Sequence, residues 1–250
     1  MELAYLCATA FAAGVVNALA GGGTLLTFPA LLAAGVSPVM ANGTSTVALV
    51  PGSISGAWGY RRELADAREW SWLLLWPSLI GGVIGAALVI VLPEHYFARL
   101  VPWLILTATV LFMLQPLIAR WTGIGKPHAK PSRTGRVGLL AFQFFVAVYG
   151  GYFGAGIGIL MLSALSLMGL PDVHRMNAVK TVLAAVINAL AAAVFALGGV
   201  VNWRFAAIMA AAAAAGGFVG AHYGRRIPRA IVRWIVIAIG LGLAAKYFAT

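Results

Sequence analysis

The chain has 250 residues, of which 62% are hydrophobic and 9% are charged, and its mean hydropathy is +0.96. A soluble domain carries roughly 25% charged residues, so this composition excludes an ordinary water-soluble globular protein. The formal net charge of +11 does not indicate a nucleic-acid partner, because the basic residues lie between apolar runs, where they mark the cytoplasmic side of a membrane protein. The single cysteine, Cys7, excludes an intramolecular disulfide and a cysteine-based metal cluster.

The apolar runs repeatedly exceed the roughly 18 to 20 residues that cross a bilayer. They lack the alternation of barrel strands, so they predict transmembrane helices. The first run lacks the basic region of a signal peptide, and we expect it to be retained. The predicted segments are, in chain order, 3–34 with a break at Gly21–Gly23, 38–60, 70–92, 96–118, 136–169 with a break around Gly154 and Gly156, 173–198, 203–224 and 228–248.

The second half of the chain repeats the first at a constant offset of 135 residues. The matched pairs include Gly21 with Gly156, Gly23 with Gly158, Asn42 with Asn177, Thr46 with Thr181, Gly85 with Gly220 and Pro93 with Pro228. Internal repeats are typical of secondary transporters, whose substrate site lies between the halves. We therefore expect a membrane repeat at 1–118, a cytoplasmic linker at 119–135 and a second membrane repeat at 136–250.

The basic residues indicate how the halves are oriented. If all eight segments cross the membrane, ten basic residues lie on one side and six on the other. If the two glycine-broken segments instead dip in and return, thirteen lie on one side and three on the other. The positive-inside rule favours the second arrangement. The predicted fold is an all-α integral membrane protein of two inverted repeats, each with a re-entrant broken segment and about three transmembrane helices, and with both termini periplasmic.

The glycine breaks are the first candidate site. Glycine tolerates a positive φ, so a Gly triplet within an apolar run predicts a helix break, with Thr24 opening a half-helix that ends near Leu32. The N–H groups and positive dipole end of such a half-helix favour an anion. Close helix packing through small residues is the alternative. It is the reading that we prefer for three further glycines of the first repeat and their copies, which are Gly81, Gly82, Gly85, Gly216, Gly217 and Gly220.

A second candidate group lies on the segments that follow each break. Asn42 and Thr46 are four residues apart, so both side chains can face one cavity. Lys180 stands where the first repeat has Ser45. It is the basic residue well inside a predicted span, and such residues are costly unless paired or functional. We expect a cationic pocket that includes Lys180, although a lysine that extends to the lipid headgroups is the simpler alternative.

Other polar residues are open to two interpretations. Interhelical hydrogen bonding explains Asn17, Gln143 and Asn188 as well as ligand contact does. Asp172 and His174 can titrate in a proton-coupled cycle, but we expect Asp172 to cap the helix that follows and His174 to lie at the interface. The six carboxylates all lie at or near predicted loops, and the four histidines lack metal-ligand spacing. The sequence thus predicts no catalytic site, no metal site and no cofactor.

These motifs resemble a known family. The stretch 17–60, with Ala20-Gly-Gly-Gly-Thr24 and Ala41-Asn-Gly-Thr-Ser-Thr46, is similar to the first repeat of the TauE/SafE family of sulfite exporters. The stretch 150–202, with Gly154-Ala-Gly-Ile-Gly158 and Met176-Asn-Ala-Val-Lys-Thr181, is similar to its second repeat. The resemblance implies an inner-membrane transporter for sulfite, sulfonates or related organosulfur anions. Carried to matching positions, it implies a substrate site of Gly21, Gly22, Gly23, Thr24, Asn42, Ser45, Thr46, Gly156, Gly158, Asn177, Lys180 and Thr181.

We therefore expect a secondary transporter that is embedded in the lipid bilayer and exports a small sulfur-containing anion, driven by the anion gradient or by protons. A passive anion channel is an alternative that the sequence leaves open. A membrane-embedded enzyme or sulfur-relay protein is a third, but it needs a thiol or nucleophile deep in the bundle, and Cys7 lies near the terminus.

Overall fold

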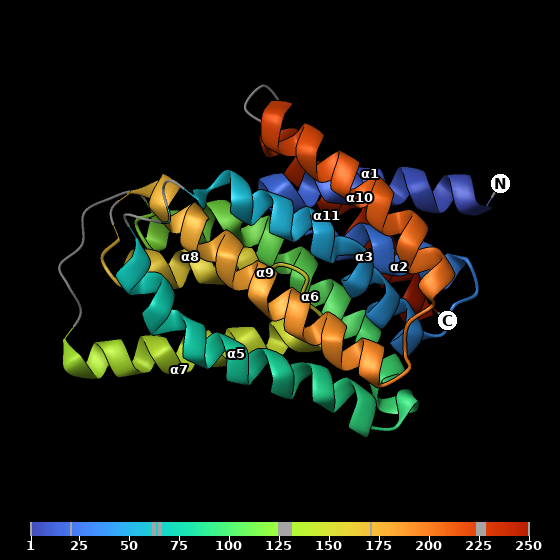
Figure 1. Cartoon of the computed structure of the whole chain (residues 1–250), viewed down its shortest axis with the longest axis horizontal. Coiled ribbons are helices and arrows are strands. Elements are labelled where there is room, and N and C mark those ends of the chain that lie inside the picture. Colours follow the sequence, from blue (N-terminus) through green and yellow to red (C-terminus); the bar gives the residue numbers. More distant parts are fainter. Residues whose placement is uncertain are drawn as a thin grey trace.

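The computed structural model describes residues 2–20, 22–61, 64, 67–124, 132–170, 172–223 and 229–249. Figure 1 shows helices that run mostly along the long axis of the molecule. Their bounds are α1 Glu2–Ala20, α2 Thr24–Ala33, α3 Pro38–Gly59, α5 Arg68–Val91, α6 Glu94–Trp121, α7 Arg133–Tyr152, α8 Ile157–Leu167, α9 Val173–Leu197, α10 Trp203–Tyr223 and α11 Arg229–Ala249. Every predicted segment is found as a helix or as a pair of helices, and both breaks fall at the predicted glycines.

The outer surface of the bundle is apolar. Helices α5, α6, α9 and α10 contain stretches long and apolar enough to cross a membrane. Large side chains on the outside of the bundle are uncovered: Trp76 is 63% exposed, Val91 77% and Leu197 90%. Exposed apolar surface on this scale favours lipid over water as the surrounding solvent. The predicted all-helical integral membrane fold is thereby confirmed.

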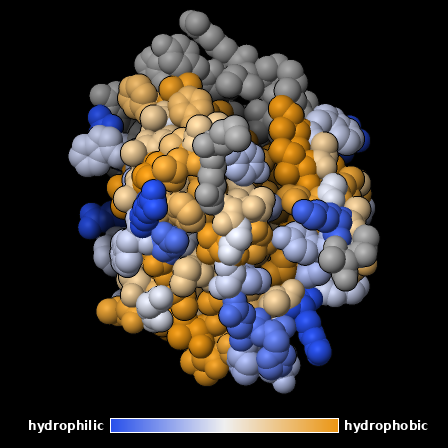
Figure 2. All heavy atoms as spheres, turned by 90° about the vertical axis from the view of Figure 1, so that its right-hand side faces the viewer, coloured by the Kyte–Doolittle hydropathy of each residue, from blue (hydrophilic) through white to orange (hydrophobic). Residues whose placement is uncertain are grey.

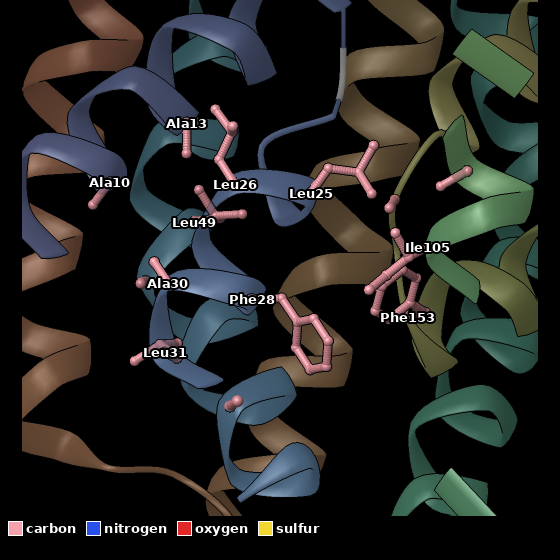
Figure 3. Close-up of a cluster of buried hydrophobic side chains, with 14 of the residues drawn as sticks. Ala10, Ala13, Leu25, Leu26, Phe28, Ala30, Leu31, Leu49, Ile105 and Phe153 are labelled. Atoms are coloured by element: carbon pink, nitrogen blue, oxygen red, sulfur yellow. The ribbon is translucent and has the colours of Figure 1, made fainter. Parts of the chain in front are cut away.

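Each broken segment folds back on itself. A Cβ placed on Gly23 would lie 2.7 Å from the carbonyl oxygen of Ala13, and Figure 3 shows Leu26 beside Ala13. Helix α2 therefore returns along α1. At the second break, a Cβ on Gly150 of α7 would lie 3.3 Å from Ile157 Cδ1. Helix α8 begins against the last turn of α7 in the same manner.

The two hairpins point in opposite directions. In Figure 1 both chain termini lie at the right-hand end of the molecule, and α1 begins there. Helix α7 begins at the left-hand end. Figure 2 views the molecule from the right-hand side of Figure 1 and shows hydrophilic residues scattered over that face rather than gathered in one patch.

The helices of the two halves exchange contacts. Helix α1 packs against α10, while its counterpart α7 packs against α5, the counterpart of α10. Helix α3 packs against its own counterpart α9. At these crossings a Cβ on Gly216 would collide with the carbonyl oxygen of Phe11, and one on Gly85 with that of Val148. The expected packing role of these glycines is confirmed, because they allow backbones to approach closely inside the membrane.

A cluster of aromatic side chains lies beside the first hairpin. The ring of Phe28 meets the ring of Phe153 at a centroid distance of 5.3 Å and that of Phe97 at 6.4 Å, both edge to face. Figure 3 shows Phe28 pointing from α2 toward Phe153. The three rings fix α2 against the segment that precedes α8.

We predict that Gly85→Ala lowers the unfolding temperature of the purified protein in detergent. The added methyl meets the backbone of α7, and overpacking of this kind costs roughly 1–3 kcal/mol. The matched control is Gly138→Ala, also a helical glycine, whose added Cβ meets nothing within 4 Å. That change is neutral or stabilises by up to about 1 kcal/mol through helix propensity. Equal unfolding temperatures for the two variants would contradict the packing role.

Candidate anion-binding site between the two broken segments

The two half-helices begin inside the protein without side-chain caps. Helix α2 has Gly23 at its N-cap position, and α8 has Gly156, with a φ of 79° that favours glycine. Residues 22–31 and 155–159 are all buried. The first hydrogen bond into α8 runs from Ile159 N to Gly156 O, at 3.1 Å, so the N–H groups of the two preceding residues are directed out of the helix end. At α2 the hydrogen bonds begin earlier, from Leu25 N to Gly22 O at 3.1 Å and from Leu26 N to Gly23 O at 3.0 Å, so α8 presents more backbone donors to the interior than α2 does.

The two breaks lie next to each other. A Cβ on Gly154 would sit 3.7 Å from Asn188 Oδ1 and 3.9 Å from Thr24 Oγ1. The start of α2, the break before α8 and the middle of α9 therefore meet at one place. Gly154 has a φ of 82°, so the chain reaches this close approach through a conformation that other residues rarely adopt.

Hydrogen bonds from α3 hold both breaks in position. Ser45 Oγ lies 2.5 Å from Thr27 Oγ1 on α2. Asn42 Nδ2 donates to the carbonyl oxygen of Tyr152, at 2.9 Å, which satisfies an acceptor at the carboxyl end of α7. Asn42 Oδ1 is buried with no hydrogen-bond partner among the described residues. Two of the predicted site residues thus support the breaks directly.

The other predicted site residues are placed in different ways. The Thr46 hydroxyl donates to the carbonyl oxygen of Asn42 at 2.8 Å, and the Thr181 hydroxyl to that of Asn177 at 2.7 Å, so both bond within their own helices. Gly22 lies against the ring of Phe112, which a Cβ would strike. Gly158 is buried in the first turn of α8, and Gly21 lies outside the described residues.

Lys180 lies inside the protein. Its side chain is 6% exposed, and among the described residues it is the one charged side chain that is buried. Its helix neighbours Val179 and Leu183 belong to an apolar cluster that includes Met161 and Leu165 of α8. A lysine that extended to the headgroups would be exposed, so the snorkelling alternative does not describe this structure.

The start of α9 behaves as expected. The side chain of Asp172 accepts a hydrogen bond from His174 N at 2.8 Å and lies 3.6 Å from Arg175 Nε. The predicted cap is confirmed. Within the described residues no Asp or Glu is buried, and no three His, Cys, Asp or Glu side chains could hold a metal ion.

Ser53, which was not among the predicted site residues, joins Asn17 and Asn188 in one polar cluster. Ser53 Oγ accepts hydrogen bonds from Asn17 Nδ2 at 3.2 Å and from Asn188 Nδ2 at 3.4 Å. Ser53 and Asn188 are separated by 135 residues, the offset between the repeats. A search for matched positions that are both polar, rather than identical, is the signal that would have found this pair.

The region of the two breaks provides backbone N–H groups, neutral amides and hydroxyls, and the buried Lys180 lies on α9, the helix that also carries Asn188. None of the carboxylates among the described residues is buried. Such groups bind an anion but supply no paired acids and no base near a nucleophile.

Known proteins resemble the chain over almost its whole length. Residues 6–247 match the family described as Sulfite exporter TauE/SafE. A protein of Haemophilus influenzae named "Probable membrane transporter protein" is 29% identical, covering 98% of this chain and 93% of its own length. "Probable membrane transporter protein ORF9" of a Sinorhizobium species is 29% identical, with 99% and 92% covered. "Probable membrane transporter protein YfcA" of Escherichia coli K12 is 28% identical, with 98% and 88% covered. No solved structure matches the chain.

The match covers far more than half of the chain and spans both broken segments and the helices that follow them. The expected resemblance is confirmed: the chain belongs to the TauE/SafE sulfite exporter family, and it has a role in membrane transport.

Proposed function

We propose that this protein is a secondary transporter that binds a small sulfur-containing anion between the amino ends of α2 and α8. The observation that carries the proposal is the meeting of two buried half-helix starts that have no side-chain cap. A helix end in the interior of a membrane protein must satisfy its N–H groups with some partner. A bound anion supplies that partner and also interacts favourably with the positive ends of both helix dipoles.

Lys180 adds a positive charge to the second repeat, which also contains α8. A buried ammonium is costly unless its environment compensates it. An anion bound near α8 lowers this cost, while the lysine and the helix ends together disfavour a cation. We therefore expect sulfite, a sulfonate or a related organosulfur anion as the substrate, in keeping with the description of the family.

The enclosure of the site favours a carrier over an open pore. A Cβ on Gly22 would strike the ring of Phe112, and the rings of Phe28 and Phe153 pack edge to face beside α2 (Figure 3). An anion can leave only if the two repeats move against each other, as in alternating access. Net movement is expected to be export, driven by the anion gradient or by protons.

The charge distribution supports an orientation in the bacterial inner membrane. Thirteen basic residues lie on the side of the linker and three on the other side when the broken segments re-enter. The positive-inside rule then places the linker in the cytoplasm and both termini in the periplasm.

We predict that sulfite raises the unfolding temperature of the wild-type protein in detergent and that Lys180→Ala weakens this effect. A ligand that binds only the folded state stabilises it by about 2.7 kcal/mol at 100 times its Kd. Loss of the buried charge should raise the apparent Kd about tenfold or more, since a hydrogen bond to a charged group contributes roughly 1.5–3 kcal/mol. Sulfate and taurine, titrated in parallel, report on the preferred anion.

The matched control is Lys246→Ala, which removes an exposed lysine near the end of α11 and should leave the sulfite response unchanged. Arg225→Ala, outside the described residues, should behave likewise. A Lys180→Ala protein that binds sulfite as tightly as wild type would remove Lys180 from the site. A wild-type protein that responds to no sulfur anion would overturn the proposed substrate class.

Carrier and channel are separated by counterflow in proteoliposomes. We predict that internal unlabelled sulfite accelerates the uptake of external labelled sulfite, because a carrier returns faster when it is loaded. Uptake that is unaffected by internal sulfite, together with large single-channel currents in planar bilayers, would indicate a pore instead.

The orientation is tested with fusions to the carboxyl terminus. We predict that alkaline phosphatase fused after Thr250 is active in intact cells and that green fluorescent protein at the same position is dark, since the first enzyme needs the periplasm. The same reporters fused within the linker after truncation at 125 should give the reverse result. A fluorescent carboxyl-terminal fusion would refute the proposed sidedness.

A further inference from the structure

Two asparagines lie at the two breaks. The Cβ of Asn17 would be 3.2 Å from a Cβ on Gly23, the N-cap residue of α2. Asn188 Oδ1 would be 3.7 Å from a Cβ on Gly154, in the break before α8. The amides therefore border the same small region as the half-helix starts, one from α1 and one from α9.

One hydroxyl joins these two amides. Both Asn17 Nδ2 and Asn188 Nδ2 donate to Ser53 Oγ, and Ser53 in turn donates to the carbonyl oxygen of Leu49 at 3.0 Å. Because Ser53 and Asn188 occupy matched positions of the two repeats, their contact lies where the halves meet symmetrically. The cluster thus occupies the place in a two-repeat transporter where the substrate binds.

Each amide keeps one N–H donor that does not bond to Ser53. A primary amide has two N–H donors and one acceptor oxygen, and Ser53 takes one donor from each asparagine. Asn17 and Asn188 are each only half-buried, although their partners are interior residues. By contrast, the other amide–hydroxyl pair, Gln143 Nε2 to Ser78 Oγ at 2.9 Å, is fully buried on both sides.

We propose that Asn17 and Asn188 bind the oxygen atoms of the transported anion through their remaining N–H donors and that Ser53 positions both amides. This inference rests on the proposed function and adds how the site recognises its substrate. The helix ends and Lys180 act on the charge of any anion, whereas two amides held at a fixed separation act on an anion with several oxygens. The site is therefore expected to prefer oxyanions, such as sulfite or a sulfonate group, to a halide.

The first test measures sulfite and chloride binding by thermal stabilisation for Asn17→Leu and Asn188→Leu. We expect each change to weaken sulfite binding about tenfold or more, since donors to a charged group are lost, and to affect chloride little. Gln143→Leu, which removes a comparable amide–hydroxyl bond between α7 and α5, should lower the unfolding temperature without changing the selectivity. Asn188→Ser, which copies the residue at the matched position, serves if Asn188→Leu fails to fold.

Wild-type selectivity for sulfite over chloride in both asparagine variants would overturn the proposal. It would then leave the amides with an interhelical role alone.

A second test does not depend on the identity of the substrate. In a Cys7→Ser background, which contains no other cysteine, Asn188→Cys in native membranes should react with an ethylsulfonate methanethiosulfonate. It should react more slowly with the trimethylammonium analogue of the same size. Ser78→Cys, at a fully buried position, should react with neither reagent.

Failure of wild type to bind any sulfur anion, combined with selective labelling at position 188, would overturn the sulfur substrate and keep the anion site at the amides. A cysteine at 188 as unreactive as one at 78, or one that prefers the cationic reagent, would overturn the amide site itself.

Discussion

The structure depends on one constraint, which is that backbone polar groups inside a membrane must find partners within the protein. Two helix breaks in the interior violate the simplest solution to this constraint, an unbroken helix. The chain compensates with specific contacts: Asn42 donates to the last carbonyl of α7, and the hydroxyls of Ser45 and Thr27 join α3 to α2. The N–H groups at the starts of α2 and α8 are the groups for which no side chain provides a cap. A protein that supports the acceptors of its breaks and leaves donors at the start of α8 open is suited to an anion.

The two repeats share a backbone plan but differ in the chemistry that each contributes. The first repeat has Ser45 bonded to α2, whereas the second has the buried Lys180 at the matched position. Phe28 of α2 belongs to an aromatic cluster, whereas the matched residue of α8 is Ser163, whose hydroxyl donates to the carbonyl oxygen of Ile159. Duplication explains the shared arrangement of helices. Divergence at these few positions gives α2 an aromatic contact that α8 lacks and gives the second repeat a buried charge that the first lacks at the matched position.

The helices, the breaks and the family could be predicted from the sequence because each has a local signal. Long apolar runs specify the spans, Gly21–Gly23 and Gly154 mark the breaks, and Asp172 lies where a cap is needed. The structure adds that α2 packs back along α1 (Figure 3). Which polar groups meet was beyond the sequence. The contact of Ser53 with Asn17 and Asn188 joins three helices, and no local pattern reports which faces of α1, α3 and α9 turn toward one another.

The position of that contact bears on how such a site can serve both sides of the membrane. Helix α2 extends from the breaks toward the end of the molecule that carries the termini, and α8 extends toward the other end (Figure 1). In the proposed mechanism, one route from the site follows each half-helix. Close glycine contacts hold α1 against α10 and α7 against α5, so each hairpin is attached to a helix of the opposite repeat. A tilt that loosens one hairpin from the centre therefore moves a helix of the other repeat with it, and the two routes are expected to open in alternation rather than together.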